Sequence, residues 1–329
     1  MRKKRSGLRA IGVDLGATKL AVAEVNGEGR VLQRVQEPTR PESGPGNVKQ
    51  TLLTAIRSLL KTEDPPLVGI GIGIAGQIDP DGGMVRFAPN LGWENVPLQT
   101  ELNEALRLPV IVTNDVRAAT VGEWLFGAGR GCRDLVCLFV GTGIGGGVVT
   151  QRRLLTGSSN TAAELGHLVV DLQGPLCTCG GHGCMEAFAG GWAIARHAQE
   201  TVSNDPSAGQ ALLDRAKNRL ENITAKLVTE AAQAGDLLAC RLMERVTKAL
   251  IAGTISLVHA FNPARFIFGG GVIEGMPELV ARIEEGVRKQ AFRTATERLR
   301  IVHSQLGGDA GVVGAAALAI RSFAGKEGN

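Results

Sequence analysis

Tyrosine is absent from the sequence, and aromatic residues of all kinds make up only 4% of it. Platforms for stacking nucleic-acid bases are built from aromatic side chains, so they are scarce here. A net positive charge is also lacking once the N-terminus is set aside. Four of the 36 basic residues lie at positions 2–5, and the others equal the 32 acidic residues in number. Because a nucleic-acid-binding face needs clustered basic residues, a neutral body argues against that class.

Long hydrophobic runs are lacking as well. A bilayer span needs about 20 apolar residues, whereas the candidate apolar run at 67–78 is short and rich in Gly and Ala. The basic residues at 2–5 resemble the start of a signal peptide, but Asp14 and Lys19 interrupt the apolar run that should follow. We therefore expect a cytoplasmic protein that does not bind membranes and has a disordered basic tail.

Glycine, in contrast, is abundant, with 45 of 329 residues, about twice the average usage of roughly 7%. It gathers in turns that follow apolar runs, at 14–19, 141–147 and 269–271. Successive backbone N–H groups in such turns form a concavity suited to phosphate, and the hydroxyls of Thr18 and Thr142 add donors. One such turn is equally typical of an ordinary hairpin, but three of them favour a nucleotide.

The spacing of these glycines excludes two other nucleotide-binding folds. The sequence contains no G-x-x-x-x-G-K-[ST], so it is not a P-loop protein. Residues 141–146 fit G-x-G-x-x-G as letters, but a strand is expected after them where a dinucleotide fold opens a helix.

One pattern occurs twice in the chain. A strand at 9–15, a glycine turn and a strand at 20–25 are followed about 125 positions later by a strand at 135–140, a glycine turn and a strand at 148–155. This repeat predicts two related α/β lobes around a central cleft.

We assign 1–115 plus about 310–329 to a small lobe and 116–309 to a large lobe. The other expected strands are 30–37, 67–75, 110–113, 265–268 and 299–303. The expected helices are 48–61, 97–107, 115–126, 192–203, 208–219, 222–234, 236–261, 277–291 and 310–322.

Two aspartates stand where expected strands end. Asp14 adjoins the first glycine turn, where a carboxylate would organise Mg²⁺ through water; a turn-capping Asp is the alternative. Asn114 and Asp115 follow the strand at 110–113 and precede a helix. A carboxylate at this place can accept a proton from a substrate hydroxyl during phosphoryl transfer. The alternative is a helix N-cap, for which Asn and Asp are preferred.

Three of the six cysteines lie close together, at Cys177, Cys179 and Cys184. In a cytosolic protein this density indicates a metal before a disulfide. Structural Zn²⁺ takes four ligands, as in a Cys₃His site. His182 and His167 are both candidates for the fourth, and we favour His167 because His182 is crowded against Cys184. Free thiols in a surface loop are the alternative.

Together these motifs resemble the ROK family (repressors, open reading frames and kinases), most of all its glucokinase branch. The resemblance covers the chain from residue 14 to about 317. The strings that carry it are Asp14-Leu-Gly-Ala-Thr-Lys19, Ala88-Pro-Asn-Leu-Gly-Trp93, Asn114-Asp115, Gly141-Thr-Gly-Ile-Gly-Gly-Gly147, Glu164-Leu-Gly-His167 and Cys177-Thr-Cys-Gly-Gly-His-Gly-Cys-Met-Glu186. One departure is Ala17, where the family usually has Gly.

The resemblance implies an actin-like, ribonuclease-H-like ATPase fold that binds ATP with Mg²⁺ and holds a structural Zn²⁺. It makes Asp115 the catalytic base toward a sugar hydroxyl. The implied sugar contacts are Asn90, Asn114, Asp115, Glu164, His167 and Glu186. The expected nucleotide contacts are Asp14, Gly16, Thr18, Lys19, Gly141, Thr142, Gly143, Gly270 and Gly271. The implied Zn²⁺ ligands are His167, Cys177, Cys179 and Cys184. The family commonly forms dimers or tetramers, so we expect a homodimer or homotetramer.

The expected activity is transfer of the γ-phosphoryl group of ATP to the 6-hydroxyl of D-glucose. A kinase for N-acetylglucosamine, N-acetylmannosamine or fructose is the alternative within the enzyme class. The family's sugar-responsive repressors carry a helix-turn-helix before the first strand, and about eight residues precede that strand here, so we expect a kinase. A third alternative, a conformational ATPase, leaves the cysteine cluster and the Glu-x-Gly-His string unexplained.

Overall fold

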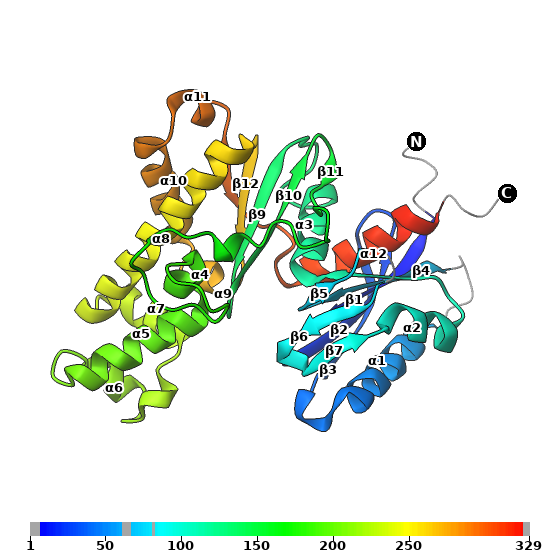
Figure 1. The fold of residues 1–329 in the computed structure, drawn as a ribbon, viewed down its shortest axis with the longest axis horizontal. Coiled ribbons are helices and arrows are strands. Elements are labelled where there is room, and N and C mark those ends of the chain that lie inside the picture. The colour runs from blue at the N-terminus through cyan, green and yellow to red at the C-terminus, as the bar shows by residue number, and fades with distance from the viewer. Residues whose placement is uncertain (1–6, 61–66, 81–82, 325–329) are drawn as a thin grey trace. The chain divides into compact units, whose positions relative to one another are not determined.

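The computed structural model describes residues 7–60, 67–80 and 83–324 (Figure 1). The basic tail at 2–5 lies outside the described residues. The chain forms two compact units. The first comprises Met1–Gly131, Leu154–Ala163 and Gln305–Asn329, and the second comprises Cys132–Arg153 and Glu164–Ser304. The first unit thus extends past residue 115, the boundary expected from the sequence, because the helix that begins there packs within the first unit.

The first unit is built on a five-stranded sheet in the order β3-β2-β1-β4-β8. Its strands are β1 (Arg9–Leu15), β2 (Lys19–Asn26), β3 (Val31–Pro38), β4 (Leu67–Ile74) and β8 (Val110–Asn114). Strand β1 runs antiparallel to β2 and parallel to β4, which is itself parallel to β8. The carboxyl ends of β1, β4 and β8 therefore lie at one edge of the sheet, where Asp14 and Asn114 are found.

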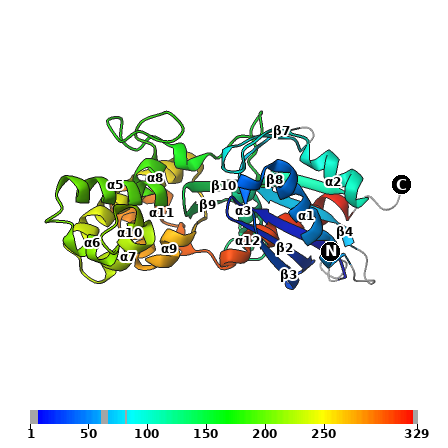
Figure 2. The ribbon, with the colours of Figure 1, turned by 90° about the horizontal axis from the view of Figure 1, so that it is seen from below.

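The two faces of this sheet differ because successive side chains of a strand point to opposite sides. On β4, the isoleucines at 70, 72 and 74 join the core with α1 (Pro45–Leu59) and α2 (Leu98–Leu106). The other face is formed by glycines and lies against α12 (Ala310–Phe323) (Figure 1, Figure 2). A Cβ at Gly71 would lie 1.8 Å from the carbonyl oxygen of Ala315. The backbone of α12 therefore rests directly on the sheet.

Helix α3 (Asp115–Leu125) packs on α12 in the same backbone-to-backbone way. A Cβ at Gly314 would lie 1.6 Å from the carbonyl oxygen of Ala118, and one at Gly122 would lie 2.5 Å from that of Ala310. Real side chains do not come so close, so glycine alone permits this approach.

A small antiparallel sheet of the first unit escaped the sequence analysis. Its strands are β5 (Gln77–Ile78), β6 (Val85–Ala88) and β7 (Trp93–Val96). Strands of two to four residues are too short to show an alternating pattern. The turn between β6 and β7 carries Asn90 at the surface, and the side chain of Trp93, which follows the turn, is buried.

The second unit has a sheet in the order β11-β10-β9-β12-β13. Its strands are β9 (Leu135–Val140), β10 (Ile144–Thr150), β11 (Arg153–Leu154), β12 (Arg265–Gly269) and β13 (Arg300–His303). Strand β9 is antiparallel to β10 and parallel to β12, as β1 is to β2 and β4. The shared strand order confirms the internal repeat that the sequence predicts.

The second glycine turn is shorter than predicted, because β10 begins at Ile144 and not at residue 148. The glycines at 145–147 pair with β9 and belong to the strand. A Cβ at Gly146 would lie 2.7 Å from the side chain of Leu165, so glycine serves packing there and not turning.

The helices of the second unit surround α8 (Leu237–Phe261), which contacts α4, α5, α7 and α10. The others are α4 (Met185–Ala189), α5 (Gly191–Asn204), α6 (Gln210–Arg215), α7 (Ala225–Gln233), α9 (Gly271–Gly275), α10 (Glu278–Gln290) and α11 (Arg293–Thr296). Helix α6 ends before the predicted residue 219, because Lys217 and Asn218 take a left-handed backbone. Across the described parts of both units, each helix is too short or too polar to cross a bilayer.

The contact between α3 and α12 makes a measurable prediction. Gly314→Ala should lower the free energy of unfolding by about 3 kcal/mol, because its methyl group must push the two helices apart. The control is Gly46→Ala in α1, where a Cβ meets nothing within 4 Å; it should leave stability unchanged or raise it by up to about 1 kcal/mol. Urea unfolding measures both variants, and equal midpoints would contradict the packing described.

Candidate functional site

The first glycine turn is held by the loop that follows β3. The N–H of Gly16 donates to the carbonyl of Lys19 at 3.0 Å. The hydroxyl of Thr39 donates to the carbonyl of Gly16 at 2.7 Å, and its N–H donates to that of Thr18 at 3.2 Å. The side chains of Thr18 and Lys19 remain exposed at the tip of the turn. Sequence reasoning missed Thr39, since a single Thr in a loop of prolines and glycines carries no pattern.

Asp14 sits at the end of β1 on the glycine face of the sheet. A Cβ at Gly311, in the first turn of α12, would lie 2.6 Å from its Oδ2 atom. Burial, and after it repulsion from Asp115, raises the pKa of Asp14 from 3.8 to about 6, against the opposing effect of Lys19. The two carboxyl groups are therefore electrostatic neighbours within the first unit. Such a pair favours a cation, which would relieve the repulsion.

Asn114 and Asp115 occupy different positions at the start of α3. Asn114 is the N-cap of α3, since its Oδ1 accepts the N–H of Arg117 at 3.2 Å. Its amide nitrogen donates to the carbonyl of Gly76 at 3.3 Å, which fixes its orientation. Asp115 is the first residue of the helix, and its Oδ1 accepts the N–H of Val116 at 2.8 Å. The N-cap of α3 is thus Asn114 and not Asp115.

Hydrogen bonds with the start of α5 and with Glu186 hold the second glycine turn. The N–H groups of Gly191 and Trp192 donate to the carbonyls of Gly141 and Thr142 at 2.9 and 3.0 Å. The buried Oε2 of Glu186 accepts the N–H of residue 144 at 2.6 Å. A Cβ at residue 143 would lie 2.5 Å from the same oxygen, so glycine is needed there.

Glu186 also joins this turn to the cysteine loop. Its Oε1 accepts the indole N–H of Trp192 at 3.2 Å and lies 3.5 Å from the hydroxyl of Thr178. Sequence reasoning had assigned this carboxylate to the sugar alone. In the structure it is also the acceptor that connects the turn, the cysteine loop and α5.

The third turn lies beside the second. Gly270 has a φ of +90°, and a Cβ there would lie 2.5 Å from the carbonyl oxygen of Val140, the residue that precedes Gly141. The ends of β9 and β12 therefore bring the turns at 141–143 and 270–271 together at one edge of the second sheet.

His167 and the three loop cysteines form one cluster, in which the ligand atoms all lie within 4.8 Å of one another. The Sγ of Cys177 is 3.7 Å from the Nδ1 of His167, and the Sγ atoms of Cys179 and Cys184 are 3.7 Å apart. Tetrahedral Zn²⁺ with bonds of about 2.3 Å to sulfur and 2.0 Å to nitrogen requires edges of roughly 3.6–3.8 Å. These residues therefore fit a Cys₃His zinc site.

His182, the alternative fourth ligand, faces elsewhere: its Nδ1 lies 3.3 Å from the carbonyl oxygen of Gly174. Burial raises the pKa of the Cys184 thiol to about 12 and also raises that of Cys177. A hydrogen bond from the backbone of Gly181 lowers the pKa of the Cys179 thiol.

The predicted residues fall into two sets. The first unit holds Asp14, Gly16, Thr18, Lys19, Asn90, Asn114 and Asp115. The second holds Gly141, Thr142, Gly143, Glu164, His167, Cys177, Cys179, Cys184, Glu186, Gly270 and Gly271. The side chains of Asn90 and Glu164 are exposed, whereas that of Glu186 is buried. Both the expected nucleotide contacts and the expected sugar contacts thus draw on both units.

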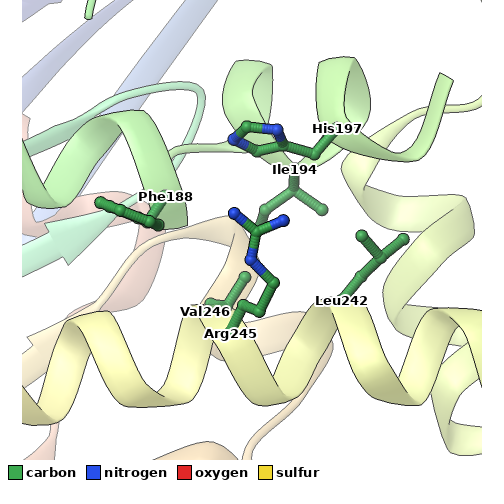
Figure 3. A pocket seen from close by; sticks show the side chains of 6 residues that line it. All are labelled: Phe188, Ile194, His197, Leu242, Arg245 and Val246. Carbon is green, nitrogen blue, oxygen red and sulfur yellow. The ribbon is translucent and has the colours of Figure 1, made fainter. Parts of the chain in front are cut away.

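A separate small hollow, with a cavity volume of about 10 Å³, lies between α5 and α8 (Figure 3). Arg245 extends from α8 toward His197 of α5. Burial lowers the pKa of His197, and the positive charge of Arg245 adds to that effect. The volume of this hollow is far below the roughly 300–1,000 Å³ of typical ligand sites. None of the predicted residues lines it; the lining residues are Phe188, Ile194, His197, Leu242, Arg245 and Val246.

Two α/β units of one topology, each with a glycine turn after its first strand, define the actin-like ATPase fold. The model of the ROK family matches residues 10–322, and the chain belongs to that family.

Known members include enzymes and regulators. The glucokinase of Thermotoga maritima is 39% identical over 312 residues, which cover 94% of this chain and 97% of that protein. The crystal structure of a ROK family glucokinase from Streptomyces griseus, in complex with glucose and AMPPNP, has a TM-score of 0.82 and 35% identity, covering 95% of this chain and 99% of that chain. The xylose repressor of Caldicellulosiruptor bescii is 30% identical, covering 94% of this chain and 77% of the repressor.

The raised pKa of Asp14 predicts a cost in stability. Because its pKa is higher in the folded state than in the unfolded state, wild-type stability should fall as the pH rises from about 4 to about 6. Asp14→Asn should therefore raise the free energy of unfolding by roughly 2 kcal/mol at pH 7.5 and by much less at pH 4. Urea unfolding without nucleotide tests this, and a gain that is the same at both pH values would contradict it.

The cysteine cluster predicts a metal content. Cys179→Ser should lower bound zinc from about one ion per chain to near zero, because a structural site loses its metal with one of four ligands. It should also raise the KM for sugar by loosening the loop that supports Glu186. Cys240→Ser, at an exposed thiol outside the cluster, is the control. Elemental analysis measures both proteins, and equal zinc contents would refute the assignment.

Proposed function

We propose that this protein is an ATP-dependent glucokinase that transfers the γ-phosphoryl group of ATP to the 6-hydroxyl of D-glucose. The observation that carries the proposal is the similarity to glucokinases over nearly the full length of both chains. The site supports it, because several of the residues that the family resemblance implies for sugar or nucleotide lie at strand ends or glycine turns, among them Asp14, Asn114 and Gly141.

Asp115 is proposed as the general base. At the N-terminus of α3 its carboxylate accepts the proton of the 6-hydroxyl while that oxygen attacks the γ-phosphorus. The bond from the γ-phosphorus to the leaving oxygen breaks, so ADP and glucose 6-phosphate are formed. Asn114, whose amide is fixed by Gly76, and the exposed Asn90 and Glu164 would orient the sugar.

The nucleotide would be held by the glycine turns of both units. Backbone N–H groups at 16–18 and 141–143 suit phosphate oxygens, and the exposed ammonium of Lys19 adds positive charge. Mg²⁺ bound with the nucleotide would supply charge neutralisation at the phosphates. Asp14, whose carboxylate stands beside that of Asp115, is the residue proposed to position this ion.

The role proposed for Zn²⁺ is structural. The four ligands close the coordination sphere, and their loop leads directly into α4, which bears Glu186. Through Glu186 the zinc loop supports the second glycine turn. We also infer a cytoplasmic location, where cysteines stay reduced and ATP is available, and an assembly of two or four identical chains.

One alternative is a repressor, which the similarity to the xylose repressor supports. That similarity, at 30% identity, is lower than the 39% identity to the glucokinase of Thermotoga maritima. A sugar-sensing role alone does not require a carboxylate at position 115. Kinases for N-acetylglucosamine, N-acetylmannosamine or fructose share the chemistry proposed for Asp115, so a panel of sugars separates them from a glucokinase.

The proposal predicts that the purified protein forms ADP from ATP in the presence of glucose, measured in a coupled assay. Asp115→Asn should lower kcat by roughly 10²–10⁴, because it cannot accept the proton, while glucose binding persists. Turnover with another hexose but not with glucose would overturn the substrate assignment.

A matched control separates catalysis from capping. Asn114→Asp keeps an oxygen that can cap α3 but loses the amide donor to Gly76, so the cap of the helix should persist while the side chain is no longer fixed by Gly76. If Asp115→Asn lost only about 1 kcal/mol of stability and retained kcat, Asp115 would be a helix-end residue and not the base.

A further inference from the structure

Glu123 is a fully buried carboxylate near the end of α3. Its Oε2 accepts the N–H of Ala128 at 2.8 Å, and its Oε1 accepts those of Gln305 and Leu306 at 2.9 and 2.7 Å. A buried carboxylate is costly unless it is hydrogen-bonded, and here three backbone donors satisfy it. Glu123 therefore connects α3 to two segments that are far apart in sequence.

Arg117, also buried and on the same helix, holds a third segment. Its Nη1 donates to the Oδ1 of Asn160 at 2.6 Å, and its Nη2 donates to the carbonyl of Ala162 at 2.8 Å. Asn160 in turn donates to the carbonyl of Ile78 at 3.0 Å. The excursion at 154–163 is thereby fastened to the first unit.

These three segments adjoin the places where the chain passes from one unit to the other. The passages fall after residues 131, 153, 163 and 304. Glu123 binds residue 128, ahead of the first passage, and residues 305–306, directly after the last. Arg117 binds residues 160 and 162, directly ahead of the third. Two buried charges of α3 thus fix three of the four connections.

The same helix begins with Asp115. The residues assigned to sugar and nucleotide are divided between the units, so the reaction depends on how the connections hold the second set with respect to Asp115. We infer that Arg117 and Glu123 are positioning residues for phosphoryl transfer: by fixing three connections to the helix that carries the base, they set the alignment of the reacting groups. This inference rests on the proposed glucokinase activity.

The chemistry makes such alignment matter for rate more than for binding. Each ligand has expected contacts in both units, so a loosened connection also weakens binding somewhat, but the 6-hydroxyl oxygen, the γ-phosphorus and the carboxylate must meet in one exact geometry. A misplacement of about 1 Å can cost about a hundredfold in rate. Loss of the connections should therefore lower kcat much more than it raises KM.

The test is Glu123→Gln, which keeps the shape of the side chain but places an amide NH₂ against backbone N–H groups. We expect kcat to fall by roughly 10–100-fold, with KM for glucose and for ATP changed by less than about threefold. Asn160→Gly, which removes the partner of Arg117 and keeps the left-handed backbone at this position (φ +57°), should shift kcat in the same direction.

Glu24→Gln is the matched control. Glu24 is another fully buried carboxylate of the first unit, and it pairs with Arg9 of β1 at 2.5 Å and not with a residue of the connections. It should lose stability at least as much as Glu123→Gln while keeping wild-type kcat, measured at a temperature where circular dichroism shows both variants folded. An equal loss of kcat in both variants would overturn the inference, since general destabilisation would then explain it.

Hydrogen exchange separates this inference from the proposed function. In Glu123→Gln the amides of residues 128, 305 and 306 should exchange at least about tenfold faster than in the wild type, because their acceptor is weakened. A wild-type protein that does not phosphorylate glucose refutes the proposed function, whereas unchanged exchange refutes the role of Glu123. Wild-type turnover in both Glu123→Gln and Asn160→Gly also overturns the inference.

Discussion

The close approach of three backbones is the constraint on which the first unit depends. Helix α12 contacts β1 and β4 through Gly12 and Gly71, and α3 through Gly314, at distances that leave no room for a side chain. At the edge of this contact, Gly311 lets α12 begin against the carboxylate of Asp14. The aspartates at 14 and 115 come near each other because Gly73 pairs with Asp14, and a Cβ there would lie 3.2 Å from the Cα of Asp115. The same packing that stabilises the unit thus holds like charges together, an arrangement that costs stability until a cation relieves it.

Much of this architecture can be predicted from the sequence, because its signals are local. Apolar strands, glycine turns and helix periodicity located most elements, and cysteine spacing located the cluster of His167 with three cysteines. What escaped prediction depends on partners distant in the chain. The run at 67–74 looks uniformly apolar, yet its isoleucines and glycines serve opposite faces. Thr39 holds the first turn only because β3 returns beside it. The glycines at 145–147 were predicted to be a turn, because the sequence does not show why a strand needs glycine. In the structure, contact with Leu165 gives the reason for one of them.

A comparison of the two halves of the internal repeat separates the features that the fold requires from those that a ligand would require. Both sheets share one strand order, and both open with a hairpin at a glycine turn. Residues 15 and 20 pair across the first turn, whereas residues 140 and 144 pair across the second, so the second turn is one residue shorter. In each hairpin, the first strand carries one residue just before the pair that is nearest the turn. This residue is Asp14 in the first hairpin and Phe139 in the second. The topology alone therefore requires no carboxylate there, and Asp14 calls for an explanation in terms of a ligand.

The support behind each turn differs in a corresponding way. Thr39 donates hydrogen bonds to backbone carbonyls of the first turn. The backbone of the turn therefore sets the direction of the exposed side chains at 18 and 19. The second turn is held through its carbonyls by the start of α5 and through one N–H by Glu186. Because Glu186 follows the cysteine loop directly, the order of that loop is transmitted to the turn by a hydrogen bond of 2.6 Å. A metal that never touches the nucleotide would in this way still govern how rigidly its phosphates are held.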